Sequence, residues 1–432
     1  MDKNRRTAYL TLMDVESKQA YSNIALNHRI ASIRPESPAL VREMVYGVLE
    51  NKLYLDYIID QFIKNRASKL KNSDLTVLRL GIYQLKFLES VPDYAAVSES
   101  VDLAKRYCHG KEGFINGVLR SFLRADKEVE LPDRSEDQVR YLSIKYSYEP
   151  WIIELWLEEY APDFVEELLA AGNETPHLVI RVNSLKTSKE DLKRRIIAKD
   201  FHAEDGSLCK EALHVEGRGL LDGKLFKSGM FSVQDESSIL AVNMLDPHPF
   251  ETVMDVCAAP GGKSLAIAEK MMNKGTVISW DIYKRKLAII DREAERLGIS
   301  IVETRTWDAT RVDSSMIEKA DRVLVDAPCS GLGVVRRKPE IKYKKRSAEI
   351  DSLPRKQLAI LSASSKYVKP GGTLVYSTCT ISPYENQMVV KDFLKRNPNF
   401  SKEEELQLLP NVNGTDGFFI CKMKKDDWLE SI

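Results

Sequence analysis

The sequence lacks any long apolar stretch. Nowhere in its 432 residues do about eighteen apolar residues run together, which is the length that a helix needs to cross a bilayer. The first six residues lead into an amphipathic stretch without the apolar core of a signal peptide. Hydrophobic residues make up 43% of the chain and charged residues 30%, as in soluble globular proteins. We therefore expect a soluble, cytoplasmic protein with no membrane partner.

The sequence also lacks an excess of charge of either sign. Lys plus Arg and Asp plus Glu number 64 each, so the net charge by itself indicates no polyanionic partner. A nucleic acid would have to be bound by local basic patches that the total conceals. The length predicts two or three domains.

Cysteine is scarce and dispersed. The six cysteines form no Cys-x-x-Cys pair, and none clusters with histidine at the spacing of zinc ligands. Reduced thiols and no metal are expected, because a disulfide framework would be unusual in so long a chain. An isolated cysteine is usually an inert core residue, and we assign that role to Cys108, Cys209 and Cys421. Cys257 opens a loop described below, where it packs or contacts a ligand without reacting.

Three patterns divide the chain. Residues 1–130 carry apolar side chains at steps of three and four, such as Val45, Val48 and Leu49, which is typical of a helical bundle. After an acidic, aperiodic linker, residues 140–235 mix helical and strand-like stretches and predict a small α+β module. From 236 to 432 strands and helices alternate, which is typical of a parallel sheet covered by helices. The expected fold is therefore multidomain, with all-α, α+β and Rossmann-like α/β parts in that order.

The expected strands of the third domain end in residues suited to binding a ligand. These strands are Thr252–Cys257, Thr276–Trp280, Ile301–Thr306, Arg322–Val325, Thr373–Ser377 and Gly417–Met423. The first enters a loop of small residues, AAPGG, which lets backbone N–H groups approach a ligand beside a helix start. Asp281 follows the second strand, where a carboxylate can accept both hydroxyls of a ribose. Asp308 follows the third strand, at a position suited to the edge of an adenine ring.

Each of these features has a simpler interpretation. A Gly-rich turn often only joins a strand to a helix, and Asp281 and Asp308 could be helix N-caps. Three such features in register at one sheet edge favour a nucleoside-containing cofactor. A nicotinamide cofactor is the chemical alternative, but the loop is not GxGxxG and nothing downstream is suited to hydride transfer.

Cys329 and Cys379 follow two further apolar strands, in the segments DAPCSGLG and YSTCTI. Because adjacent parallel strands end at one edge of a sheet, both thiols can face one ligand. Carbon 5 of cytosine is too electron-poor to attack a methylsulfonium, but a thiolate that adds to carbon 6 makes carbon 5 nucleophilic. A second group then helps to release the product. Asp326 lies beside the thiols, suited to hydrogen-bond ring nitrogen 3 and the exocyclic amine.

Spacing alone does not decide which thiol attacks. Ser382, Pro383 and Glu385 have the pattern of an N-cap, a first-turn proline and a capping-box partner. A helix start three residues after Cys379 would lower the pKa of its thiol. Cys329 lies in a Pro/Ser/Gly loop without so clear a helix start.

These segments resemble the motifs of the RNA 5-methylcytosine methyltransferases of the Nol1/Nop2/Sun group. The matching segments are VQDESS (233–238), DVCAAPGGKS (255–264), DAPCSGLGVVRRKPE (326–340) and YSTCTISPYEN (376–386). The N-terminal part resembles the NusB-like helical domain, in VREMVYGVLE (41–50), LRLGIYQLKFLESVPDYAAVSESVDLAK (78–105) and GFINGVLR (113–120). Fusion of that domain to this catalytic core is characteristic of bacterial 16S rRNA enzymes of the family. The resemblance covers nearly the whole chain.

The resemblance implies a NusB-like RNA-binding domain, an RRM-like middle module and a methyltransferase domain that uses S-adenosyl-L-methionine. It implies that Cys379 is the nucleophile and that Cys329 assists product release, with Asp326 as a further catalytic residue. Cytosine methyltransferases that act on DNA attack from the Pro-Cys motif, so Cys329 remains the alternative nucleophile. The implied cofactor-binding residues are Cys257, Ala258, Ala259, Pro260, Gly261, Gly262, Lys263, Asp281, Asp308 and Asp326. Trp280 and Trp307 stand where the family has smaller residues, which puts fine contacts with the cofactor in question.

A basic segment directly follows the Cys329 loop. Residues 336–346, RRKPEIKYKKR, contain seven basic residues and one acid. A charge run is usually a solvated helix face, but its position favours contact with RNA phosphates, with Tyr343 stacking on a base. The predicted RNA-binding residues are Arg336, Arg337, Lys338, Lys342, Lys344, Lys345 and Arg346. A helix at 186–199, with Lys193, Arg194 and Arg195, is a second candidate patch.

The favoured prediction is methylation of carbon 5 of one cytosine in 16S rRNA. The cytosine must be unstacked to meet a thiol, so a single-stranded loop nucleotide is the expected substrate. Transfer RNA or 23S rRNA would allow the same chemistry. The third alternative is an RNA-binding or antitermination factor with an inactive catalytic domain, against which the intact Cys329, Cys379 and Asp326 argue. We expect the protein to be a monomer.

Overall fold

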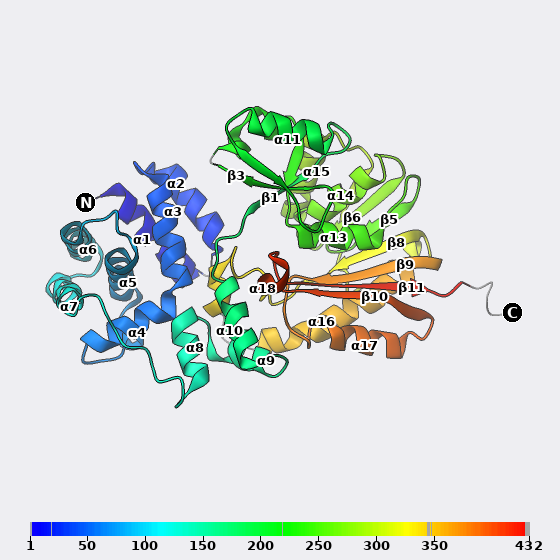
Figure 1. The fold of residues 1–432 in the computed structure, drawn as a ribbon. Coiled ribbons are helices and arrows are strands. Elements are labelled where there is room, and N and C mark those ends of the chain that lie inside the picture. The colour runs from blue at the N-terminus through cyan, green and yellow to red at the C-terminus, as the bar shows by residue number, and fades with distance from the viewer. Residues whose placement is uncertain (1, 19, 218, 344–345, 347, 428–432) are drawn as a thin grey trace. The chain divides into compact units, whose positions relative to one another are not determined.

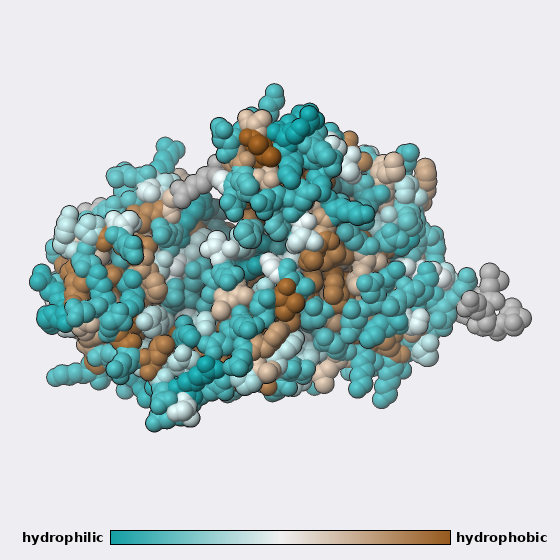
Figure 2. Space-filling view, in the orientation of Figure 1, coloured by the Kyte–Doolittle hydropathy of each residue, from teal (hydrophilic) through white to brown (hydrophobic). Residues whose placement is uncertain are grey.

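The computed structural model describes residues 2–18, 20–217, 219–343, 346 and 348–427. The chain forms two compact units (Figure 1). The first, here called the helical unit, comprises Met1–Glu174 and Val335–Lys345. The second, the sheet unit, comprises Thr175–Val334 and Arg346–Ile432. In the space-filling view of Figure 2, hydrophilic side chains cover most of the visible surface.

The helical unit confirms the expected all-α part. Its helices are α1 (Lys3–Lys18), α2 (Ser22–Ile33), α3 (Pro38–Glu50), α4 (Lys52–Phe62), η1 (Ala67–Lys69), α5 (Asn72–Phe87), α6 (Asp93–Tyr107), α7 (Glu112–Arg124), α8 (Gln138–Tyr146), α9 (Pro150–Leu157), α10 (Pro162–Ala171) and η4 (Pro339–Tyr343). The apolar residues that recur at helical spacing, Val45, Val48 and Leu49 among them, form one buried core. No helix of the described residues is long and apolar enough to cross a bilayer.

Helices α8 to α10 fold with the helical unit, although their sequence was assigned to the middle module. Ser147, which ends α8, explains part of this grouping. Its hydroxyl accepts hydrogen bonds from the backbone N–H groups of Leu53 (2.8 Å) and Tyr54 (3.3 Å) in the first turn of α4. These donors have no partner inside their own helix, so a residue from a distant segment satisfies them.

The middle module is a four-stranded antiparallel sheet within the sheet unit. Its strands are β1 (Leu178–Val182), β2 (His202–Asp205), β3 (Ala212–Glu216) and β4 (Phe231–Val233), in the order β2-β3-β1-β4. The accompanying helices are α11 (Lys189–Ile197), η2 (Leu220–Asp222) and α12 (Lys224–Lys227). Leu192 and Ile196 of α11 pack on Ile180 and Phe231 of the sheet, so the amphipathic helix covers one face. The expected α+β module is confirmed.

The large sheet of the sheet unit has seven strands. They are β5 (Thr252–Asp255), β6 (Thr276–Asp281), β7 (Val302–Thr306), β8 (Ala320–Asp326), β9 (Val368–Thr378), β10 (Phe400–Leu408) and β11 (Phe418–Lys425). The order is β10-β11-β9-β8-β5-β6-β7. Strands β5 to β9 pair in parallel, whereas β10 and β11 pair antiparallel.

Helices cover both faces of this sheet (Figure 1). Helices α13 (Glu236–Leu245), α14 (Gly262–Lys270) and α15 (Lys284–Leu297) lie on one face, and α16 (Ala348–Ser364) and α17 (Gln387–Arg396) on the other. Short helices η3 (Ser314–Met316), η5 (Ser365–Tyr367) and α18 (Pro410–Asn413) complete the unit. Side chains alternate along β8, where Val323 and Val325 join one core and Leu324 the other.

The sheet differs from the prediction at one edge. A parallel sheet was expected, and β10 was not predicted at all. Its sequence, FSKEEELQL, has four consecutive charged residues at its centre, which hide the alternation of apolar residues that identifies a strand. Charged side chains are common on edge strands because they discourage pairing with another chain. The sheet is therefore mixed, and the site lies on its parallel part, strands β5 to β9.

Candidate active site at the carboxyl edge of the large sheet

The expected cofactor loop connects β5 to α14. Gly261 has φ = 109°, and a Cβ there would lie 2.9 Å from a side-chain carbon of Ile290, so both conformation and space require glycine. Its N–H donates to the carbonyl of Ala258 at 2.7 Å. Helix α14 begins at Gly262, so the loop lies beside the positive end of a helix dipole.

Asp281 lies against this loop at the end of β6. One carboxylate oxygen accepts a hydrogen bond from the N–H of Ala259 at 3.3 Å, and the other from Tyr283 at 2.8 Å. The carboxylate is partly exposed and has lone pairs left for ligand hydroxyls. Its predicted position beside the loop is therefore observed.

A buried pair that the sequence analysis missed fixes the two ends of the loop. Asp255 ends β5, and its carboxylate accepts a hydrogen bond from the hydroxyl of Ser264 in the first turn of α14, at 2.7 Å. Burial raises the pKa of Asp255 to about 7. The available signal was an acidic residue at the end of a buried strand nine positions before a hydroxyl.

Asp308 follows β7, but its carboxylate is also engaged locally. One oxygen accepts from both the hydroxyl (2.7 Å) and the N–H (3.0 Å) of Thr310. These bonds lower its pKa. Asp308 therefore stabilises a turn, and its contact with adenine stays a prediction.

Trp280 is buried and packs on Trp307 and Tyr367, with ring centroids 5.5 and 5.4 Å away.

The structure brings the two cysteines together. Cys329 follows β8 and Cys379 follows β9, and these strands are parallel neighbours with Asp326 opposite Ser377. The two sulfur atoms are 3.3 Å apart, beyond the length of a disulfide bond, and both residues are partly accessible. Gly333 helps to join the loops, because its N–H donates to the carbonyl of Cys379 at 3.0 Å. Two thiols thus face one point at the sheet edge.

The surroundings distinguish the two thiols. The hydrogen bond with Cys379, followed by burial, raises the pKa of Cys329 well above its ordinary value. Cys329 is therefore held as a thiol while Cys379 is beside it. Burial also raises the pKa of Cys257, as expected for a cysteine that does not react.

Lys263 supplies positive charge to this point. Its Nζ lies 2.7 Å from a carboxylate oxygen of Asp326, whose other oxygen accepts from the hydroxyl of Ser377 at 2.9 Å. Burial lowers the pKa of Lys263, but the charge of Asp326, and then that of Cys379, outweigh it and leave the pKa raised. Since this attraction is mutual, the ammonium favours a thiolate at Cys379.

The expected helix start at Ser382 is wrong. Helix α17 begins at Gln387, eight residues after Cys379, with Asn386 as its N-cap. Glu385 is not a capping-box partner, because its buried carboxylate accepts from the N–H (2.9 Å) and the hydroxyl (2.5 Å) of Ser330. It also accepts from Gln357 at 2.9 Å. The cation near Cys379 is therefore Lys263, and Glu385 instead holds the Cys329 loop.

We expect Glu385→Ala to lower kcat by about 10- to 100-fold, as loss of a supporting contact to a site residue typically does. Three buried donor groups would each lose one acceptor, and the Cys329 loop would shift away from Cys379. Glu385→Gln, which keeps the shape and one acceptor, should recover part of the loss. Steady-state kinetics with the exposed Glu404→Ala as the control would measure this. An unchanged kcat in Glu385→Ala would contradict the role.

Part of the predicted RNA-binding segment is structural. Lys342 is fully buried in the helical unit, where its Nζ donates to the carbonyls of Glu50 (2.8 Å) and Tyr146 (3.1 Å) and to Asn173 (2.7 Å). Burial lowers its pKa to about 7. The expectation that Lys342 contacts phosphate is wrong, because its side chain connects three segments of the helical unit.

Tyr343 is anchored in the same unit through its hydroxyl, and its stacking on a base stays a prediction. Its hydroxyl accepts from the N–H of Lys52 at 3.1 Å and donates to Ser147 at 3.3 Å. Glu340 likewise accepts from the N–H and the hydroxyl of Ser22 at the start of α2. The signal in the sequence was the set of non-basic residues within the segment, Pro339, Glu340, Ile341 and Tyr343, which indicate a segment packed against the protein. A count of charges alone does not take them into account.

The remaining basic residues stay a prediction. Arg336, Arg337 and Lys338 are partly exposed and Arg346 is exposed, whereas Lys344 and Lys345 lie outside the described residues. In the second candidate patch the basic side chains are paired with acids. Lys193 bonds Asp205, and both Arg194 and Arg195 bond Asp191, which weakens that patch as a phosphate site.

The other three cysteines lie in the core, as predicted. Cys108, Cys209 and Cys421 are buried. Burial raises the pKa of Cys108 and of Cys421 to about 12 each, and it raises the pKa of Cys209 as well. These thiols remain protonated and have no part in the site.

Comparisons with known proteins find three parts in the same order, although the middle match includes α9 and α10. Residues 242–424 match the family described as 16S rRNA methyltransferase RsmB/F. Residues 2–124 match the NusB family, and residues 148–220 match a ferredoxin-like domain of RsmF/B-like methyltransferases. The family matches thus cover a helical, a middle and a catalytic part.

Individual relatives match along nearly the full length. The probable ribosomal RNA small subunit methyltransferase B of Bacillus subtilis is 40% identical, with 98% of both chains covered. A protein of the same name from Synechocystis sp. is 32% identical over 98% of this chain and 99% of its own. The crystal structure of PH0851 superposes with a TM-score of 0.83 at 25% identity over 98% of each chain.

Proposed function

Because this chain belongs to the RsmB/F family of 16S rRNA methyltransferases, we propose that it methylates carbon 5 of one cytosine in 16S rRNA. The proposed methyl donor is S-adenosylmethionine, and the proposed reaction passes through a covalent bond between Cys379 and the base. We place the reaction in the cytoplasm, on a cytosine in a single-stranded loop.

One observation carries the choice of carbon 5, the 3.3 Å separation of the sulfurs of Cys329 and Cys379. Nitrogen and oxygen atoms of a base can attack an electrophilic methyl group directly, whereas carbon 5 requires a nucleophile at carbon 6 and a base afterwards. Two thiols at one point, with Lys263 and Asp326 beside them, supply both functions.

The loop around Gly261 fits the proposed methyl donor. Gly261, with φ = 109°, turns the loop into the start of α14, where backbone N–H groups and the positive end of the helix dipole can bind a ligand. Asp281 is bonded to the same loop and partly exposed, as a ribose contact requires. When bound there, S-adenosylmethionine would supply an electrophilic methyl group.

The residues of the chain act in a defined order in this proposal. The Cys379 thiolate, favoured by the Lys263 ammonium, adds its electron pair to carbon 6, and the electrons of the carbon 5–carbon 6 double bond shift into the ring. Asp326 accepts a hydrogen bond from the exocyclic amine and favours a proton on nitrogen 3. Carbon 5 would then take the methyl group with this electron pair, while the sulfur–methyl bond breaks and its electrons leave with S-adenosylhomocysteine.

Cys329 completes the cycle. Its hydrogen bond with Cys379 is the largest cause of its raised pKa, and that cause disappears once the sulfur of Cys379 is bonded to carbon. Cys329 can then lose its proton to solvent and accept the proton of carbon 5. The bond between sulfur and carbon 6 breaks, the ring double bond returns, and the Cys329 thiol hydrogen-bonds the departing thiolate.

Methyl transfer to purified RNAs tests the proposal. The protein would be incubated with methyl-labelled S-adenosylmethionine and, in separate reactions, with undermodified 16S rRNA, 23S rRNA and transfer RNA. We expect label only in 16S rRNA, with bisulfite mapping placing it at one 5-methylcytosine. Label only in transfer RNA or 23S rRNA would overturn the proposed substrate, and label on a nitrogen would overturn the proposed chemistry.

A further inference from the structure

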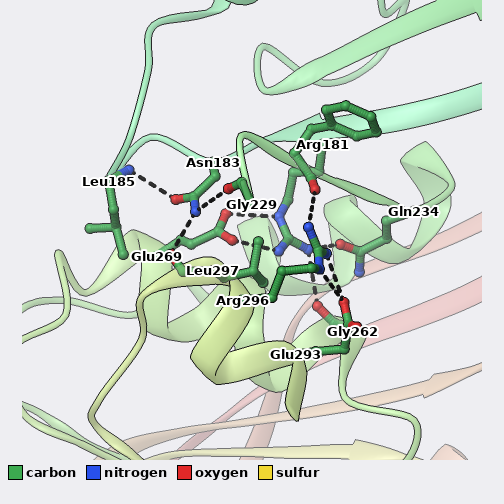
Figure 3. Close-up of polar contacts among 11 residues, drawn as sticks. Arg181, Asn183, Leu185, Gly229, Gln234, Gly262, Glu269, Glu293, Arg296 and Leu297 are labelled. Carbon is green, nitrogen blue, oxygen red and sulfur yellow. Dashed lines mark hydrogen bonds and ion pairs between the residues drawn. The ribbon is translucent and has the colours of Figure 1, made fainter. Parts of the chain in front are cut away.

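A buried arginine of the middle module reaches the cofactor loop (Figure 3). Arg181 lies on β1, and its side chain is 3% exposed. Its Nε and Nη2 donate to the two carboxylate oxygens of Glu269 on α14, at 3.0 and 2.9 Å. Such a two-pronged contact fixes orientation as well as distance.

The same guanidinium contacts the first residue of α14. Nη1 donates to the carbonyl of Gly262 at 3.0 Å and also to the side-chain oxygen of Gln234. Gly262 directly follows Gly261, the residue whose backbone shapes the cofactor loop. Arg181 thus forms hydrogen bonds with the first residue of α14 and again with Glu269, seven residues later.

Two other polar contacts hold the middle module without touching the loop. Arg296 on α15 donates to the carbonyls of Phe226 (2.7 Å) and Phe231 (3.1 Å). Asn183 donates to the carbonyls of Gly229 (2.8 Å) and Leu297 (2.9 Å). The middle module is therefore attached to α15 by hydrogen bonds that do not involve Arg181. Of the hydrogen bonds drawn in Figure 3, the one to Gly262 comes from Arg181.

We propose that Arg181 is a positioning residue for the methyl donor, so that the middle module forms part of the cofactor site. This inference rests on the proposed use of S-adenosylmethionine. An ion pair with both partners almost fully buried is costly to desolvate and is a poor device for stability alone. Its directional hold on the Gly262 carbonyl fixes the loop before the ligand arrives, which strengthens binding by lowering the ordering cost.

Binding of S-adenosylmethionine to the full chain, measured by calorimetry, tests this role. In Arg181→Lys the charge remains but the two-pronged contact is lost, and we expect the Kd to rise about tenfold, the effect of losing one or two charge-assisted hydrogen bonds. In kinetics, the KM for S-adenosylmethionine should rise by a similar factor. The kcat and the KM for RNA should each change less than about threefold, since the thiols are untouched.

Two further variants separate positioning from folding. The double variant Arg181→Met, Glu269→Met removes both charges and so avoids an unpaired buried ion, but it still lacks the contact to Gly262, and its Kd should rise like that of Arg181→Lys. Arg296→Met is the matched control, in which we expect lower thermal stability with a Kd within about twofold of the unmutated protein.

The outcomes are distinguishable. Unchanged affinity in the double variant, or an equal loss in Arg296→Met, would overturn the positioning role of Arg181. If the unmutated protein itself does not bind S-adenosylmethionine, the proposed function fails and the inference fails with it.

Discussion

Cys379→Ala should abolish methylation, with a fall in kcat of about 10⁴-fold or more, because removal of a covalent nucleophile eliminates the only route to an activated carbon 5. A neighbouring group could replace this thiolate only if Cys329, and not Cys379, were the residue that attacks carbon 6. Cys329, whose sulfur lies 3.3 Å from that of Cys379, would lose this hydrogen bond in the variant, but its burial, the second cause of its raised pKa, still disfavours a thiolate, and the Lys263 ammonium stays paired with Asp326.

Single-turnover transfer of labelled methyl to 16S rRNA measures this effect. Cys379→Ser serves as a second variant, since a hydroxyl of similar size should preserve the fold while it remains a much weaker nucleophile. Cys421→Ala, a buried cysteine of the same sheet, is the control and should retain activity. Methylation by Cys379→Ala at a rate near that of the unmutated protein would refute the assignment of the nucleophile.

Cys329→Ala should leave the attack intact and block release, so that a covalent complex of protein and RNA accumulates. Cys379 and Lys263 are unaltered in this variant, so the adduct at carbon 6 forms and methyl transfer proceeds. Without Cys329, no thiolate accepts the carbon 5 proton and no thiol hydrogen-bonds the departing sulfur. Turnover should fall by about 10²- to 10⁴-fold, the usual contribution of acid–base groups.

A denaturing gel detects this complex as a band that contains both protein and labelled RNA. The band should require S-adenosylmethionine for its methylated form and should be absent from the double variant Cys329→Ala, Cys379→Ala. Accumulation of the complex in Cys379→Ala instead would reverse the two roles and make Cys329 the nucleophile. This result would favour the arrangement in which attack comes from the Pro-Cys motif.

The sequence predicted where the site lies better than it predicted which contacts hold the site residues in place. The loop at 257–261, Asp281 and the two cysteines were placed correctly at one edge, because the carboxyl ends of parallel strands share that edge. The helix start near Ser382 was predicted wrongly, although the local pattern of a capping box was complete. Glu385 is drawn to Ser330, 55 positions earlier, and this tertiary bond outweighs the local preference for a cap.

The basic segment shows the same limit. Charge and nearness to Cys329 along the chain favoured RNA contact for all seven basic residues, yet Lys342 is buried. Its acceptors include the carbonyl of Glu50, which is 292 positions away. A surface lysine and a buried one are identical in sequence, and only the presence of unpaired carbonyls in a packed unit makes burial possible.

By itself the sequence determined the order of the three parts, the strands of the parallel sheet and the residues at their ends, since these depend on local periodicity and on the fixed geometry of parallel strands. Tertiary structure alone decided the 3.3 Å approach of the sulfurs, the burial of Lys342 and the reach of Arg181 to Gly262 across 81 positions. In each of these contacts the two residues are far apart in the chain, and the sequence around one does not indicate the other. The reason is that a side-chain hydrogen bond depends on which groups the fold brings close together in space.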